Sequence, residues 1–175
     1  MMYKVVIVGD GAVGKTTILK RYVDKKFDRD IKMTVGSDFF VKKIELEKEN
    51  ADVTLQIWDL AGQQQFSVVR PNFYMGAKGV VYTFDLTRKV TLLNLTKWQK
   101  EVENVIGKTP SILVGNKLDL VENKDDEFMQ EDALQFKKDL GALEYIETSA
   151  KEDIGVSKVF KQLTRKIFNS YSKKV

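Results

Sequence analysis

The feature that most constrains this chain is a glycine-rich loop close to its start. Residues 9–16 read Gly-Asp-Gly-Ala-Val-Gly-Lys-Thr and satisfy the pattern G-x-x-x-x-G-K-S/T. An apolar run at residues 3–8 precedes the loop, as expected of a parallel strand buried on both faces, and a helix should begin at Lys15. The loop therefore predicts a site for the phosphates of a nucleoside triphosphate at a helix N-terminus.

Each fixed position of the loop has a chemical task. Glycines let the backbone curl until successive N–H groups point at phosphate oxygens. Lys15 supplies a charge to the β- and γ-phosphates, and Thr16 offers a hydroxyl to Mg²⁺. The residues predicted to contact the phosphates are Gly11, Ala12, Val13, Gly14, Lys15, Thr16 and Thr17.

Apolar segments in the rest of the chain alternate between strand-like and helix-like spacing, which favours an α/β fold. Further strands are predicted at residues 39–47, 53–58, 79–84, 111–114 and 144–146, with helical spacing at 92–105, 133–136 and 156–168. A turn at 49–52 should join the second and third strands into an antiparallel hairpin. We predict one domain over residues 1–175 with the P-loop NTPase fold, in which a six-stranded, mostly parallel sheet has one antiparallel strand and about five helices on its two faces.

The composition excludes several kinds of chemistry. The chain has no Cys and no His, so disulfides, thiolate metal sites and histidine or cysteine catalysis are excluded. The net charge of +4 comes from Lys and Glu interspersed along the chain, which argues against nucleic acid as a partner. No apolar run approaches the ~20 residues that span a bilayer, and we expect a cytoplasmic protein.

Two loops that follow the fifth and sixth predicted strands suit a guanine base. Residues 116–119 read Asn-Lys-Leu-Asp, and residues 148–151 read Thr-Ser-Ala-Lys. The Asp119 carboxylate can accept the two N–H groups at N1 and N2 of guanine, a pair that adenine lacks. A backbone N–H near Ala150 can donate to O6, and the stem of Lys117 can lie along the base. Asn-Lys-x-Asp also occurs as a surface turn, but its place one strand before Ser-Ala-Lys favours a guanine site.

The remaining candidate residues follow the third strand and the first helix. Asp59 can hold Mg²⁺ through water, and the Gly62 N–H can reach a γ-phosphate. Gln63 can orient the attacking water, and the Thr34 hydroxyl can complete the Mg²⁺ shell. Phe27 either covers the guanine edge-on or serves in plain packing. Asp-x-x-Gly alone is a common turn. These residues therefore indicate a nucleotide site only in combination with the other loops, in this order along the chain.

Together these elements resemble the Ras superfamily of small GTPases over about residues 3–171, essentially the whole chain. The segments most similar to the Rab branch are Asp-Phe at 38–39 after Thr-Val-Gly at 34–36, Leu-Gln-Ile-Trp-Asp at 55–59, Phe-Tyr-Met-Gly-Ala at 73–77 and Val-Tyr-Thr-Phe-Asp at 81–85. The loop at 9–16 is similar to that of the Rho family. However, the 33 positions from Asn116 to Ser149 are too few for the extra helix that Rho proteins carry there.

The resemblance implies a switch that binds GTP or GDP with Mg²⁺ and hydrolyses GTP. Two loops, about residues 28–37 and 61–74, would change with the nucleotide state. The resemblance assigns catalysis to Gln63, Lys15 and Thr34, and metal binding to Thr16, Thr34 and Asp59. Beyond the phosphate loop its nucleotide contacts are Phe27, Thr34, Gly62, Asn116, Lys117, Asp119, Ser149, Ala150 and Lys151. The implied state is a monomer, and the implied partners are effectors, exchange factors and GTPase-activating proteins of vesicle traffic.

Some positions depart from the pattern of the resemblance. Gln64 stands where Rab proteins usually carry Glu, and Ser37 where they often carry Val. Ile31 lies three residues before Thr34, where Gα proteins carry an Arg, so we expect slow intrinsic hydrolysis that a partner accelerates. The final residues include no Cys and fit no prenylation motif, so membrane association is expected only if a lipidated tail is missing from this chain.

Three other interpretations account for less of the chain. An EF-hand at residues 122–132 lacks the alternating ligands and the Gly that a Ca²⁺ loop needs. A P-loop kinase or ATPase leaves residues 116–119 without a role. A module that holds GTP without turnover is disfavoured by Gln63, because such proteins often lose this amide.

Overall fold

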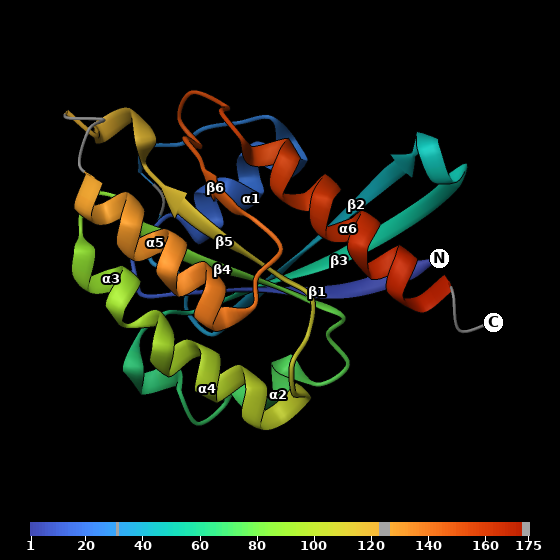
Figure 1. Ribbon diagram of the computed structural model, residues 1–175, viewed down its shortest axis with the longest axis horizontal. Coiled ribbons are helices and arrows are strands. Elements are labelled where there is room, and N and C mark those ends of the chain that lie inside the picture. The colour runs from blue at the N-terminus through green and yellow to red at the C-terminus, as the bar shows by residue number, and fades with distance from the viewer. Residues whose placement is uncertain (31, 123–126, 173–175) are drawn as a thin grey trace.

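Six strands form one sheet with helices on both faces in the computed structural model, which describes residues 1–30, 32–122 and 127–172 (Figure 1). The strands are β1 (Met2–Val8), β2 (Ser37–Leu46), β3 (Ala51–Leu60), β4 (Gly79–Asp85), β5 (Ser111–Asn116) and β6 (Tyr145–Glu147). The helices are α1 (Lys15–Asp24), α2 (Arg70–Tyr74), α3 (Lys89–Leu93), α4 (Leu95–Ile106), α5 (Glu127–Leu140) and α6 (Val156–Ser172).

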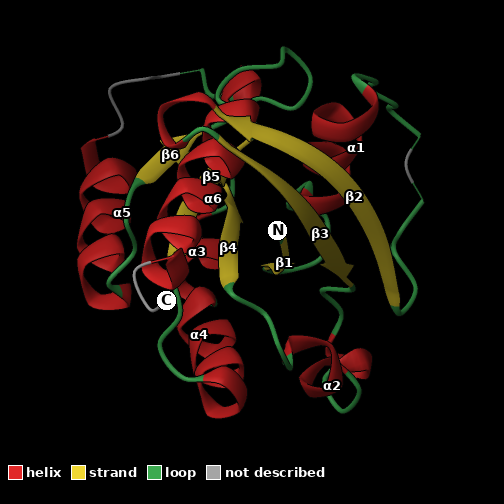
Figure 2. Cartoon of the chain, turned by 90° about the vertical axis from the view of Figure 1, so that its right-hand side faces the viewer, coloured by secondary structure: helices red, strands yellow, loops and turns green. Residues whose placement is uncertain are grey.

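The order of strands brings most of the connecting loops to one edge of the sheet. The order is β2-β3-β1-β4-β5-β6, with β2 antiparallel to β3 and every other pair parallel (Figure 2). This confirms the predicted mostly parallel sheet with one antiparallel strand. Because β2 runs the opposite way, its first residue Ser37 pairs with Leu60 at the end of β3. The segment before β2 therefore reaches the same edge as the loops that follow the parallel strands.

The predicted turn between β2 and β3 is wrong by about two residues. A short 3-10 helix at Glu47–Glu49 begins the reversal, and Asn50 completes it in the left-handed conformation with φ 47°. Asn tolerates that conformation better than most residues, so β3 begins directly at Ala51. The other strand bounds lie within one or two residues of the prediction.

The helical spacing at residues 92–105 comes from two helical segments, α3 and α4, where one was expected. They join at Asn94, which itself keeps helical angles (φ −67°, ψ −17°), so the two segments run nearly as one helix. Three apolar residues that contributed to the predicted helical spacing lie exposed: Leu93, Val105 and Leu134.

Two apolar layers cover the sheet, and β1 contributes to both. Val5 and Ile7 pack under α1 and α6, whereas Val6 and Val8 pack on the other face against residues of α2, α3, α4 and α5. The apolar run at residues 3–8 thus belongs to a strand buried on both faces, as predicted.

Some expectations concern parts of the chain that are not described. Ile31, residues 123–126 of the acidic stretch and residues 173–175 at the C-terminal end lie outside the described residues. Among the residues that are described, no helix combines the length and apolarity needed to cross a bilayer.

Phe160 is the aromatic centre of the layer beneath α6. It is fully buried, and its ring stacks on Tyr22 of α1 with 4.3 Å between ring centroids. We expect Phe160→Ala to lower the free energy of unfolding by about 3–5 kcal/mol in a urea titration, because the cavity cannot fill completely. Leu134→Ala, at an exposed site, should change it by less than about 0.5 kcal/mol. An equal loss for both variants would contradict this account of the core.

Candidate functional site

The phosphate loop between β1 and α1 needs glycine at its two ends. Gly9 (φ 144°) and Gly14 (φ 99°) have positive φ, which L side chains rarely adopt. A side-chain carbon at Gly9 would collide with the carbonyl oxygen of Thr83, and one at Gly14 would collide with the amide of Asn116. These glycines let β4 and β5 approach the loop directly.

Lys15 lies folded back over the loop that it follows. Its Nζ donates to the carbonyl oxygens of Gly9 at 2.8 Å and Asp10 at 2.9 Å. The residue is 6% exposed, and this burial lowers the pKa of the ammonium group to about 8. The negative charges of Asp59 and Asp10 act in the other direction and raise the pKa, but burial has the larger effect. The loop therefore holds a buried positive charge at the position expected of a phosphate ligand.

The three predicted metal residues meet at one point beside the loop. The Thr16 hydroxyl donates to Oδ2 of Asp59, and it lies 2.8 Å from the Thr34 hydroxyl. Thr34 also donates to Oδ2 of Asp59 at 3.4 Å. Residues from α1, from the segment before β2 and from β3 thus converge, although they are far apart in the sequence.

This cluster fits a Mg²⁺ ion. Asp59 is fully buried, which raises the pKa of its carboxyl, and its Oδ1 has no hydrogen-bond partner among the described residues. Hydroxyl and carboxylate oxygens are the donors that Mg²⁺ takes, and a few protein oxygens suffice when phosphates and water complete the shell. Over the described ranges no three His, Cys, Asp or Glu side chains gather into another candidate metal site.

The loop after β3 rests directly on the phosphate loop. A side-chain carbon at Gly62 would lie 2.5 Å from the backbone N of Gly11. Next to it, Oε1 of Gln63 is buried and has no partner within the described part of the chain. Gln63 lines a cleft of about 80 Å³ together with Lys15 and Thr34. Gln63, whose amide oxygen has no partner among the described residues, and Lys15 therefore line the same cleft.

A second cleft, of about 320 Å³, adjoins the first around the phosphate loop, because Ala12, Gly14 and Thr17 line both. It collects the residues predicted for the base. Those residues are Phe27, Asn116, Lys117, Asp119, Ala150 and Lys151. Three predicted site residues line neither cleft: Val13, Asp59 and Ser149.

The loops after β5 and β6 are joined to each other and to the phosphate loop. Asp119 accepts a hydrogen bond from the Ser149 hydroxyl at 2.6 Å, which fixes its carboxylate. The Asn116 amide donates to the carbonyl of Val13 at 3.0 Å and accepts from the Thr148 hydroxyl at 2.9 Å. Asn116 and Ser149 therefore act here by holding neighbouring residues in place.

Asp85 at the end of β4 is a site residue that sequence reasoning missed. It is fully buried and pairs with Lys117 at 2.9 Å and with Arg88 at 3.0 Å. Burial alone would raise the pKa of its carboxyl, but the hydrogen bonds from Thr87, Lys117 and Arg88 hold it below the ordinary value. The signal in the sequence was a carboxylate at the end of a buried apolar run, on the same edge as the phosphate loop.

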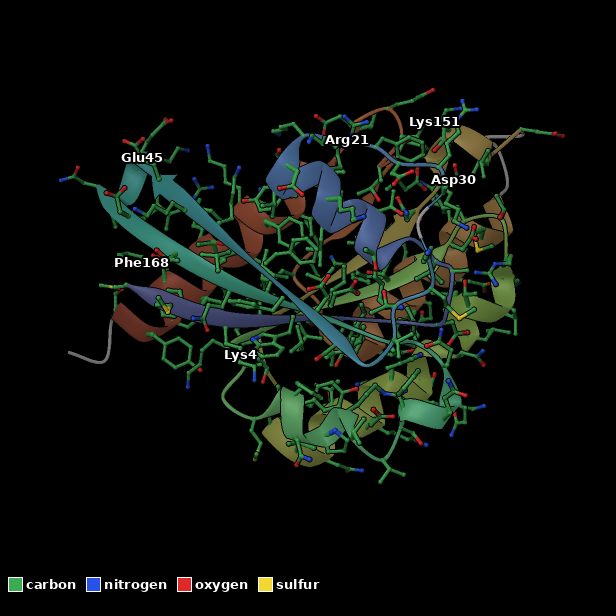
Figure 3. The ribbon with its side chains drawn as sticks, turned by 180° about the vertical axis from the view of Figure 1, so that it is seen from behind. Lys4, Arg21, Asp30, Glu45, Lys151 and Phe168 are labelled. Atoms are coloured by element: carbon green, nitrogen blue, oxygen red, sulfur yellow. The ribbon has the colours of Figure 1, made fainter. Side chains whose placement is uncertain are left out.

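Arg21 of α1 was also missed. Its Nε donates to the carbonyl of Ala150 at 2.7 Å, and its Nη2 donates to that of Lys151 at 2.9 Å. Lys151 and Asp30 lie toward the side of the molecule opposite Glu45 on the β2–β3 hairpin, and Arg21 lies between them and Glu45 (Figure 3). The first helix thus holds the loop that closes the second cleft.

Comparisons with known proteins agree on one family. The model of the Ras family matches residues 4–169. GTP-binding protein YPTC5 of Chlamydomonas reinhardtii is 37% identical over 169 residues, which cover 94% of this chain and 81% of that protein. Ras-related protein YPTC6 of the same organism is 35% identical over 175 residues, 99% of this chain and 79% of that protein. GTP-binding protein yptV5 of Volvox carteri is 37% identical over 167 residues, 93% of this chain and 80% of that protein.

The fixed carboxylate of Asp119 gives a direct test of base recognition. We expect Asp119→Asn to lower affinity for GTP about 100-fold, since two charge-assisted hydrogen bonds are lost, and to raise affinity for xanthosine triphosphate. An amide N–H₂ can donate to the carbonyl that replaces the N2 amine. Competition with a fluorescent nucleotide measures both affinities. Asp139→Asn, on the outer side of α5, should leave both unchanged, and equal binding of ATP and GTP by the wild type would contradict the assignment.

Proposed function

The chain belongs to the Ras family of small GTPases, on its Rab-like branch, and we propose that its two clefts hold GTP with Mg²⁺ so that Gln63 can promote hydrolysis. The observation that carries the proposal is the convergence of Thr16, Thr34 and Asp59 beside the cleft that Gln63 lines. No element supplies more than one of these three residues, so the site depends on the whole fold.

The nucleotide spans both clefts in this proposal. Its phosphates lie along residues 9–16, with Lys15 against the β- and γ-phosphates. The guanine enters the second cleft, where Asp119 accepts from N1 and N2 and the backbone near Ala150 donates to O6. The volume of this cleft, about 320 Å³, lies within the usual range of small-molecule sites.

Thr16, Thr34 and Asp59 would hold the Mg²⁺ ion, with the carboxylate fixed by both hydroxyls. When bound, the ion neutralises charge on the β- and γ-phosphate oxygens. Lys15 would add its positive charge to the same oxygens. Buried charges act strongly here because little water screens them.

Hydrolysis follows from the place of Gln63. Its amide orients a water molecule whose oxygen attacks the γ-phosphorus. The bond to the bridging oxygen breaks, and GDP and inorganic phosphate are released. The intrinsic rate should be slow, on the order of 10⁻⁴ to 10⁻² s⁻¹, because the sequence carries Ile31 where Gα proteins carry an Arg. An activating protein would supply that missing charge.

Two loops would report which nucleotide is bound. Thr34 and Gly62 lie in these loops, and the backbone N–H of Ala61 donates to the carbonyl of Gly36 at 2.9 Å, which joins one loop to the other. Loss of the γ-phosphate would release both, changing the surface at about residues 28–37 and 61–74. We propose that effectors, exchange factors and activating proteins of vesicle traffic recognise this surface on a cytoplasmic monomer.

The assigned role of Gln63 can be tested against its neighbour. Gln63→Leu should slow single-turnover GTP hydrolysis about tenfold or more, because the water loses its orienting amide, while GTP affinity stays the same. Gln64→Leu makes the same chemical change at an exposed side chain and should leave the rate unchanged. Hydrolysis by Gln63→Leu at the wild-type rate, with and without an activating partner, would show that the role is wrongly assigned.

A further inference from the structure

We propose that Arg70 and Glu101 are positioning residues for GTP hydrolysis, which fix the loop carrying Gln63 onto α4, the helix that also holds the phosphate loop. The inference rests on the proposed function of Gln63. It concerns two charged residues that touch neither the nucleotide nor the metal in that proposal.

Arg70 joins the loop that carries Gln63, called here the catalytic loop, to α4. Every nitrogen of its guanidinium group takes part. Its Nε and Nη2 donate to the two carboxylate oxygens of Glu101 at 2.7 and 2.9 Å, a bidentate pair. Its Nη1 donates to the carbonyl oxygen of Gln63 at 2.9 Å and to that of Ala61 at 3.3 Å. The Arg70 side chain is only 4% exposed, so water does not replace these contacts.

Two aromatic residues fix the same pair. The Tyr74 hydroxyl donates to Oε1 of Glu101 at 2.6 Å. The guanidinium group of Arg70 lies over the ring of Trp98, 4.3 Å from its centroid. Charge, hydrogen bonds and stacking therefore leave the guanidinium group one orientation, and its Nη1 must point at the backbone of the catalytic loop.

The same face of α4, with Asn94 just before it, also holds the phosphate loop. Trp98 Nε1 donates to one carboxylate oxygen of Asp10 at 2.9 Å, and the Asn94 amide donates to the other at 2.7 Å. Residues 94, 98 and 101 follow the spacing i, i+4 and i+7, which places them on one face of the helix. Figure 1 shows α2, which begins at Arg70, beside α4.

One helix face thus sets the distance between the two loops that must meet at the γ-phosphate. Gln63 is useful only while its amide points at the attacking water, and its backbone is held there by Arg70. Without Glu101 the guanidinium group would lose its orientation, and the catalytic loop would spend less time in place. The phosphate loop would keep its own contact through Asp10, so nucleotide retention should not depend on Glu101.

The test compares hydrolysis with nucleotide retention. Glu101→Gln, a change of equal size, should slow single-turnover GTP hydrolysis about tenfold, because small displacements of a positioning group are costly. Release of a fluorescent GDP should stay within about twofold. Arg70→Lys, which keeps the charge but has no second arm for Gln63, should give the same split. If Arg70 and Glu101 served only to stabilise the fold, these substitutions would change both the hydrolysis rate and the GDP release rate, or neither.

The matched control is the ion pair between Arg165 and Glu49, which has the same Nε to Oε1 arrangement at 2.9 Å in another part of the fold. Glu49→Gln should leave hydrolysis unchanged. If Gln63→Leu slows hydrolysis but Glu101→Gln and Arg70→Lys do not, the inference is overturned and the proposed function stands. If Gln63→Leu does not slow hydrolysis either, the proposed role of Gln63 is wrong, and the inference that rests on it is wrong too.

Discussion

The structure depends most on how the carbonyl groups of the phosphate loop are held. Three side chains donate to three successive carbonyls: Arg88 to Gly11, Lys117 to Ala12 and Asn116 to Val13. Because a peptide unit is planar, fixing the direction of each carbonyl also fixes the N–H of the next residue. The N–H groups then remain available for an anion, which is the basis of the phosphate site that we propose.

The sheet order explains where these donors come from. β4 and β5 follow β1 in the order of strands, so the loops after them lie next to the loop after β1. Asp85, buried at the end of β4, pairs with both Lys117 and Arg88 and keeps their charges beside the phosphate loop. The buried carboxylate is thereby compensated, as a buried charge must be. The proposed base site and the proposed phosphate site therefore share one set of supports.

The sequence predicted those parts of the molecule whose chemistry is local. Residues 9–16, the alternation of strands and helices and the carboxylate at position 59 are each visible in a short window. Contacts between residues far apart in the sequence are not visible in this way. Arg21 contacts Ala150, 129 residues away, and Arg70 contacts Glu101, 31 residues away. An exposed Arg on a surface helix and a buried Arg in an ion pair look alike until the fold brings their partners close.

The claim that the nucleotide sets the conformation of two loops is tested most directly by amide hydrogen exchange. Protection should be compared between the protein with GDP and with a non-hydrolysable GTP analogue, both with Mg²⁺. The account predicts that amides at 34–37 and 61–66 exchange more slowly with the analogue, because Gly62 then contacts the γ-phosphate and Thr34 the Mg²⁺ ion beside it, while amides at 116–119 exchange equally in both states. Equal protection of all three segments with the two nucleotides would contradict a switch.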